Sequence, residues 1–287
     1  LQLCSQMTLT LINTSQHKSN TIVGSIIAAC KLPYFLETRK LNMKFEIKHL
    51  PQKLDDVVFA DAVVAQTLNE YANNMRDKSL LLYGPKGSGK SVSAQIVLKT
   101  MMGAAAQPGL TDPLHANSFA EKHGSFDLVL QTWSAQLMMG AKHGCVIFDE
   151  LDQFTLAMQN KFRSFIDRYQ SGYVIATTNN LHLIDGPLQD RFRCLFVEYP
   201  SVLQWVPRVI QVMRSENIEL TTEQAACLLN NFEGSGRKLN DWLEDYILSI
   251  KARTAATGGD LSIAPLTITK QASTLGAANK GGQPCQN

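Results

Sequence analysis

The chain has 287 residues, a hydrophobic content of 45% and a formal net charge of +2. This length and composition exclude a wholly disordered chain and allow one large or two modest domains with a buried core. The small net charge gives no sign of a strongly basic nucleic-acid-binding protein, although a local basic patch remains possible. The six cysteines are scattered and form no C-x-x-C pair, which argues against a zinc site or a disulfide framework and favours a reduced, cytosolic protein.

The N-terminal segment, residues 1–42, is predicted to lie outside the fold. It begins with Leu1 and shows no sustained hydrophobic period, and its apolar run at residues 21–30 is too short to span a bilayer. Met43 opens the sequence Met-Lys-Phe-Glu-Ile-Lys, which is typical of a natural start. We therefore expect residues 1–42 to be an extension, and we expect no membrane attachment.

A phosphate-binding loop follows the first predicted strand, residues 80–83. It matches the pattern G-x-x-x-x-G-K-[ST] and leads into a predicted helix that begins at residues 92–98. Such a loop aims backbone N–H groups and the positive helix end at one anion, and its flanking strand and helix argue against a chance match. Lys90 is expected to reach the β- and γ-phosphates of a nucleoside triphosphate, and the Ser91 hydroxyl to bind Mg²⁺. The predicted phosphate-binding residues are Gly84, Pro85, Lys86, Gly87, Ser88, Gly89, Lys90 and Ser91.

A second apolar strand, residues 146–148, ends in the carboxylates Asp149 and Glu150. Ligands bind at the carboxyl ends of parallel strands, so both side chains are expected beside the phosphate loop. Asp149 is predicted to hold Mg²⁺ through water, and Glu150 to polarise the attacking water as a general base. Asp-Glu pairs also follow apolar runs by chance, but the position downstream of the loop favours function.

Two further strands carry polar residues at their ends. Residues 172–178 are followed by Asn179, which could contact the γ-phosphate or orient the water, although Thr-Thr-Asn-Asn is also a favourable turn. Arg191 and Arg193 come just before the strand predicted at residues 194–199. They are either ordinary surface charge or an arginine finger offered to a neighbouring subunit's nucleotide.

After Pro200 the pattern becomes helical. Residues 202–214 have apolar positions at helical spacing, and Thr221 with Gln224 fits a capping box that opens a helix through Leu229. A third helix begins with Arg237 and Lys238, where cations oppose the macrodipole unless they face an anion. Its apolar stripe is predicted to be core: Leu239, Trp242, Leu243, Tyr246, Ile247 and Ile250.

Together these segments predict an α/β domain at residues 43–200 and a small helical lid domain at residues 201–253. Residues 254–287 are small, polar and Gly-rich, and they predict a mostly disordered tail.

The whole set of motifs resembles that of the AAA+ ATPases, over roughly residues 45–252. The motifs are GPKGSGKS, VIFDELD, ATTNN, LQDRFR and GSGRKLN. Within that family the chain is most similar to clamp-loader ATPase subunits of the replication factor C small-subunit and phage types. The resemblance implies a P-loop AAA+ core, with a parallel sheet and helices on both faces, followed by a small all-helical lid domain.

The resemblance also implies ATP and Mg²⁺ as cofactors and a role for each matched residue. Glu150 would be the catalytic base, Asn179 sensor 1, Arg191 a finger acting in trans, and Arg237 a second sensor acting in cis from the lid. Val57 and Val58 would border the adenine. Partners would be other AAA+ subunits, primed or junction DNA and a sliding clamp, in the cytoplasm or, for a viral protein, inside the host cell.

Two features depart from the clamp-loader pattern. The finger reads Asp190-Arg191-Phe192, whereas clamp loaders usually have Ser-Arg-Cys. Clamp loaders also carry a helical collar domain, and the residues after Arg253 are too few and too polar to form one. We therefore expect a truncated chain, an oligomer without a collar, or another AAA+ type.

Four functions remain open from the sequence. The first is an ATPase that loads a sliding clamp on primed DNA, and the second a helicase-loader or transposition-type DNA-binding regulator. A protein-remodelling ATPase with a pore loop ranks lowest, because the stretch at residues 117–122 has the lone aromatic Phe119 without a Gly. A catalytically dead subunit is disfavoured by the intact Lys90, Glu150 and Arg191.

Overall fold

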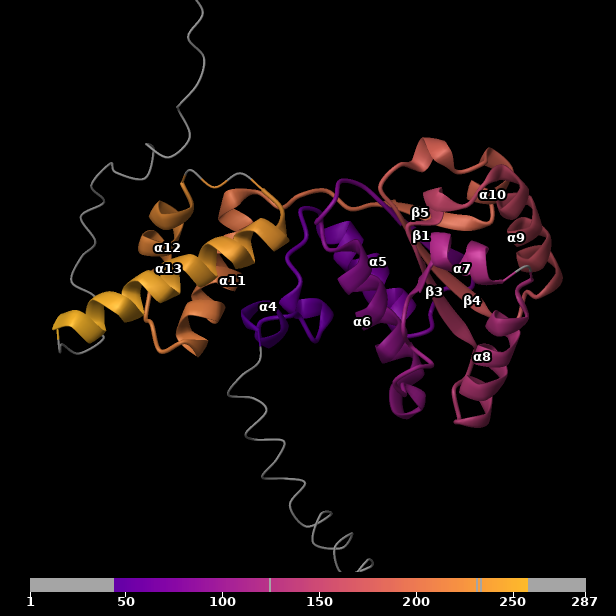
Figure 1. Ribbon diagram of the computed structural model, residues 1–287, viewed down its shortest axis with the longest axis horizontal. Coiled ribbons are helices and arrows are strands. Elements are labelled where there is room, and N and C mark those ends of the chain that lie inside the picture. The colour runs from indigo at the N-terminus through magenta and orange to yellow at the C-terminus, as the bar shows by residue number, and fades with distance from the viewer. Residues whose placement is uncertain (1–43, 124, 231, 233, 258–287) are drawn as a thin grey trace, which may run out of the picture. The chain divides into compact units, whose positions relative to one another are not determined.

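The computed structural model describes residues 44–257, with the exception of residues 124, 231 and 233 (Figure 1). The chain divides into two compact units between Pro51 and Gln52. The described part of the first unit is residues 44–51, which contain the short helix α4 (Phe45–Lys48). The predicted N-terminal extension lies outside the described residues, so it stays a prediction, as do the other domain boundaries.

The second unit is built on a parallel sheet with the strand order β2-β3-β4-β1-β5. The strands are β1 (Ser79–Tyr83), β2 (Leu114–His115), β3 (Cys145–Asp149), β4 (Tyr173–Thr178) and β5 (Phe192–Phe196). The prediction for the last strand was shifted: it spans Phe192–Phe196 and not residues 194–199. Its limits follow from pairing with β1, in which Ser79 lies opposite Phe192 and Tyr83 opposite Phe196.

Helices cover both faces of this sheet, as the sequence predicted (Figure 1). One face packs against α5 (Ala62–Ala72) and α6 (Lys90–Met102), in a core that includes Leu80 and Leu82. The other face packs against α7 (Ala116–Lys122), α8 (Asp127–Met138) and α9 (Leu156–Arg168), in a core that includes Leu81. Since successive side chains of a strand point to opposite faces, a strand buried on both faces is a continuous apolar run. The shorter helical segments are η1 (Leu54–Asp56), η2 (Gly103–Ala105), η3 (Leu151–Gln153), η4 (Leu181–Leu183) and α10 (Gly186–Gln189).

The C-terminal part of the second unit consists of α11 (Val202–Ser215), α12 (Thr222–Leu229) and α13 (Gly236–Thr257). Thr221 caps α12 in the capping box that the sequence predicted. In the predicted stripe of α13, Leu239, Leu243, Ile247 and Ile250 are buried, whereas Trp242 and Tyr246 are half-buried and stack on each other. Over the described ranges, no helix has the length and hydropathy that a membrane span requires.

A buried glutamine replaces part of a strand at one edge of β3. Strand β2 is so short that it pairs only with Phe148 and Asp149, which leaves the start of β3 without a neighbour on that side. The Gln136 amide fills this place: it accepts a hydrogen bond from the Cys145 backbone N–H at 2.7 Å and donates to the Cys145 and Leu110 carbonyls, both at 2.7 Å. Because Gln136 is fully buried, water cannot take over these bonds.

Replacing Gln136 with leucine should therefore lower the free energy of unfolding by about 2–4 kcal/mol, since it leaves buried backbone groups unpaired. Urea unfolding measures this loss. The matched control is Gln131→Leu, which changes an exposed position of the same helix and should stay within about 0.5 kcal/mol of the unmodified chain. Equal losses in the two variants would contradict the role assigned to Gln136.

Candidate nucleotide-binding site

The phosphate loop connects β1 to α6 through backbone conformations that require glycine. Gly84 has φ 145°, and a Cβ there would lie 2.3 Å from the Val197 carbonyl oxygen. Gly87 has φ 81°, and a Cβ there would lie 2.5 Å from the Ser235 Cβ. The Gly87 carbonyl also accepts a hydrogen bond of 3.2 Å from the Gly236 N–H, so the start of α13 contacts the loop.

Lys90 is the first residue of α6, and its ammonium group is turned back onto the loop. The Nζ atom donates to the carbonyl oxygens of Gly84 at 2.9 Å and Pro85 at 2.7 Å. The side chain is only 6% exposed, and this burial lowers the pKa of Lys90, against the opposing effect of the nearby Asp149 and Asp152 carboxylates. The positive charge of Lys90 therefore lies at the phosphate loop, toward which the N-terminal N–H groups of α6 also point.

The two residues predicted to bind Mg²⁺ lie together. The Ser91 hydroxyl donates to Asp149 Oδ1 at 2.8 Å, across 58 positions of sequence. Thr177, at the end of β4, donates to the same oxygen, and His115 Nδ1 lies 3.9 Å from Oδ2. A hydroxyl and a carboxylate beside a phosphate loop fit Mg²⁺, which prefers oxygen ligands and completes its shell with water and phosphate.

Glu150 follows β3 in the left-handed backbone region, with φ 58°. Its N–H donates to the Thr177 hydroxyl at 3.2 Å, while its side chain is exposed. A non-glycine residue in this region is uncommon and carries strain that the surrounding structure must hold. A second threonine helps to hold it, because the Thr178 hydroxyl donates to Asp152 Oδ1 at 2.8 Å, in the segment that follows Glu150.

The remaining predicted residues on this side surround the loop. Asn179 is the first residue after β4 and is half-buried. Val57 and Val58 are half-buried after η1, and a Cβ on Gly89 would lie 3.8 Å from Val57 Cγ1. Arg237 is exposed and follows Gly236, the residue that contacts the loop.

Sequence reasoning missed Thr177 and Tyr199. Thr177 was indicated only as part of a strand, although the pairing of Phe148 with Ala176 places it beside Asp149. The Tyr199 hydroxyl donates to the Lys86 carbonyl in the loop, 113 positions away. No local pattern marks either contact.

Arg191 lies away from this group of residues. It precedes Phe192, which pairs with Ser79 at the start of β1, whereas the phosphate loop begins after Tyr83 at the other end. The strand has five residues, so the two ends are roughly 13 Å apart at ~3.3 Å per residue. Arg191 thus lies at the amino ends of the strands, whereas the phosphate loop of its own chain lies at their carboxyl ends.

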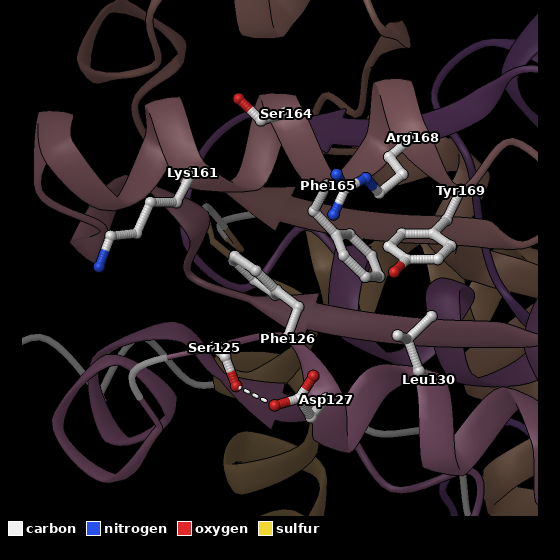
Figure 2. Close-up of a pocket in the computed structure, with 9 residues that line it drawn as sticks. All are labelled: Ser125, Phe126, Asp127, Leu130, Lys161, Ser164, Phe165, Arg168 and Tyr169. Atoms are coloured by element: carbon white, nitrogen blue, oxygen red, sulfur yellow. Dashed lines mark hydrogen bonds between the residues drawn. The ribbon is translucent and has the colours of Figure 1, made fainter.

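A groove of about 510 Å³ lies outside this site, between α9 and the start of α8 (Figure 2). Lys161 and Arg168 line it from α9, and Asp127, which accepts a hydrogen bond from Ser125, lines it from α8. Arg163 lies on the same helix but contacts Asp185 at 3.5 Å instead. The three basic residues of α9 therefore have different surroundings: two line the groove, and the third forms an ion pair elsewhere.

Residues 80–199 match the family model of ATPases associated with various cellular activities, AAA. These residues form an AAA ATPase domain. The chain is 26% identical over 230 residues to a probable replication factor C subunit 5 of Caenorhabditis elegans, covering 74% of this chain and 60% of the relative. It is 24% identical over 209 residues to the replication factor C small subunit of Methanothermobacter thermautotrophicus, covering 71% and 63%. The chain therefore spans less than two thirds of these relatives' length.

Solved structures of the Thermotoga maritima RuvB Holliday junction branch migration motor share the fold. One of them has a TM-score of 0.52 and 15% sequence identity, and the match covers 76% of this chain and 69% of RuvB. At this identity the likeness concerns the fold alone.

The contact between Gly87 and Ser235 gives a sharp test of how the AAA domain meets α13. Gly87→Ala should lower the free energy of unfolding by about 2–3 kcal/mol, because it adds a clash to an unfavourable φ. Gly140→Ala is the matched control: Gly140 has φ 93° with open space around it, so only about 1 kcal/mol is expected. Adding Ser235→Gly to Gly87→Ala should recover the difference in a denaturant titration. No recovery would show that Ser235 is not the obstacle.

Proposed function

We propose that the chain is an ATPase that binds ATP and Mg²⁺ at subunit interfaces of an oligomer. One observation carries the proposal. Lys90, Ser91, Asp149 and Glu150 converge at the carboxyl edge of the sheet, while Arg191 lies at the opposite edge. A site that needs both sets of residues is completed by a second chain.

Each residue then has a separate task. Lys90 exchanges its two carbonyl partners for the β- and γ-phosphates, at little cost because it is already desolvated. Ser91 and Asp149 hold Mg²⁺, which when bound neutralises charge developing on the phosphates. Thr177 keeps Asp149 oriented by donating to the oxygen that Ser91 also contacts.

The hydrolytic step uses side chains that can contact the attacking water or a neighbouring chain. The exposed Glu150 carboxylate accepts a proton from the attacking water, and Asn179 orients that water or the γ-phosphate. Arg191 of a neighbouring chain stabilises the negative charge of the transition state. Arg237 reaches the γ-phosphate from its own chain, starting one residue beyond the contact between Gly236 and the loop.

We further propose that this ATPase is a clamp-loader-like subunit, which works with other AAA+ subunits to load a sliding clamp on primed DNA. The similarity to replication factor C subunits supports this reading. A helicase-loader or transposition-type regulator is the second candidate, kept because the Asp190-Arg191-Phe192 finger departs from the usual clamp-loader pattern. The pore-loop class loses its one sequence feature, because Phe119 is 2% exposed and packs against Phe126 and Phe148.

Glu150→Gln should keep nucleotide binding and lower ATP turnover by about a hundredfold or more, since it removes the general base but keeps the shape. Turnover is measured by phosphate release, and binding by titration with a fluorescent ATP analogue. Glu121→Gln, an exposed carboxylate on α7, is the control and should behave like the unmodified chain. Normal turnover in Glu150→Gln would remove Glu150 from the mechanism.

The clamp-loader reading predicts joint stimulation of ATP turnover by a sliding clamp and primed DNA. The rate is compared for the chain alone, with each component, and with both, using Glu150→Gln as the background. Unprimed single strands and blunt duplexes serve as DNA controls. Stimulation by DNA alone, unchanged by any clamp in a panel, would favour the regulator instead.

A further inference from the structure

The arginine finger is held in its own chain by two partners. Arg191 Nε donates to Asp167 Oδ1 at 3.0 Å, and Nη2 donates to Oδ2 at 3.1 Å. The guanidinium and the carboxylate therefore form a bidentate, two-pronged ion pair. Arg191 Nη1 donates to the Pro187 carbonyl at 3.0 Å. These contacts engage Arg191 from the last turn of α9 and from α10.

The two partners leave part of the guanidinium available. It has five N–H donors in a fixed plane, and the contacts with Asp167 and Pro187 use three of them. One N–H remains on each terminal nitrogen. Two such donors form the edge that binds two oxygens of one phosphate. Arg191 can therefore keep its contact with Asp167 while it binds a phosphate.

The ion pair has a two-pronged geometry that most pairs on a protein surface lack. Exposed pairs contribute little when they are single and mobile, but a two-pronged geometry is the exception. Asp167 is carried by α9, which is anchored in the core through the buried Phe162 and Phe165. The hydrogen bonds from Arg191 lower the pKa of the Asp167 carboxyl below its ordinary value, so the carboxylate stays charged at neutral pH.

We infer that Asp167 is a positioning residue for catalysis, which holds Arg191 with its free edge ready for the γ-phosphate on a neighbouring chain. This inference rests on the proposed trans-acting finger. A long exposed side chain loses rotamer freedom when it binds, and Asp167 removes part of that freedom beforehand. The ion pair accordingly acts on the rate of hydrolysis and leaves the binding of ATP by the same chain unchanged.

Asp167→Asn tests this, because it keeps the size of the side chain but removes the charge and one acceptor. We expect kcat for ATP to fall about tenfold, with KM changed less than about twofold. Asp167→Glu should recover part of the rate, and the control Glu121→Gln should change neither parameter. The urea midpoint of unfolding should stay close to that of the unmodified chain, since the pair is largely exposed.

Mixing experiments separate positioning from a structural effect within one chain. Lys90→Ala disables the nucleotide site of its own chain but leaves its finger intact. Mixing it with Asp167→Asn should restore part of the turnover, just as mixing it with Arg191→Ala should, because at some interfaces an intact site of one variant then meets the intact finger of the Lys90→Ala chain. The double variant Asp167→Asn/Arg191→Ala should be no slower than Arg191→Ala alone.

The failure of this inference looks different from the failure of the proposed function. If Arg191→Ala is slow and rescued in mixtures, but Asp167→Asn keeps or exceeds normal kcat, the positioning role is overturned. A slow Asp167→Asn that Lys90→Ala does not rescue also overturns it, because the defect then lies in its own site. If Arg191→Ala itself turns over ATP normally or is never rescued, the trans finger fails, and the inference fails with it.

Discussion

The parallel register of β1, β3 and β4 is the constraint on which the candidate site depends. Tyr83 lies opposite Thr178, and Phe148 lies opposite Ala176. The phosphate loop, Asp149 and Thr177 therefore lie side by side at the carboxyl ends of these strands. A slip of one residue would turn every side chain of a strand to the other face. Asp149 would then lose the Thr177 hydroxyl, and the apolar side chains of the strand would face the wrong helical layer. The same burial that stabilises the fold therefore sets the geometry of the polar residues.

The local features of this chain were predictable because each depends on residues close in sequence. The phosphate loop, the carboxylates at the end of β3 and the Thr221 capping box follow from spacing and side-chain type, and the structure has all three where they were expected. The limits of β5 were not predictable, because they are fixed by the length of its partner β1. Val197 and Tyr199, which both favour strands, follow Phe196, and only pairing shows where the strand ends.

The contacts that sequence reasoning missed join distant segments through side chains without a motif. Gln136 completes the edge of β3, Tyr199 contacts the phosphate loop, and Asp167 binds Arg191. Gln136 and Asp167 are polar residues within a helix, where a solvent-exposed position is the usual expectation. Their partners depend on which helix covers which strand, so periodicity alone could not identify them.

If Arg191 is the trans-acting finger proposed above, its position has a consequence for regulation. A phosphate loop and a finger at opposite edges of one sheet cannot meet within a chain, but they can meet repeatedly in a head-to-tail assembly, where one type of interface recurs. Hydrolysis is then a property of the interface, and whatever changes the fit between neighbours changes the rate. An ion pair that orders the finger before contact makes this dependence steeper, because a small displacement of the neighbour removes an oriented group and not a mobile one. Under the proposed mechanism, the contact of Arg191 with Asp167 and its distance from the phosphate loop of its own chain act together, so that assembly controls hydrolysis.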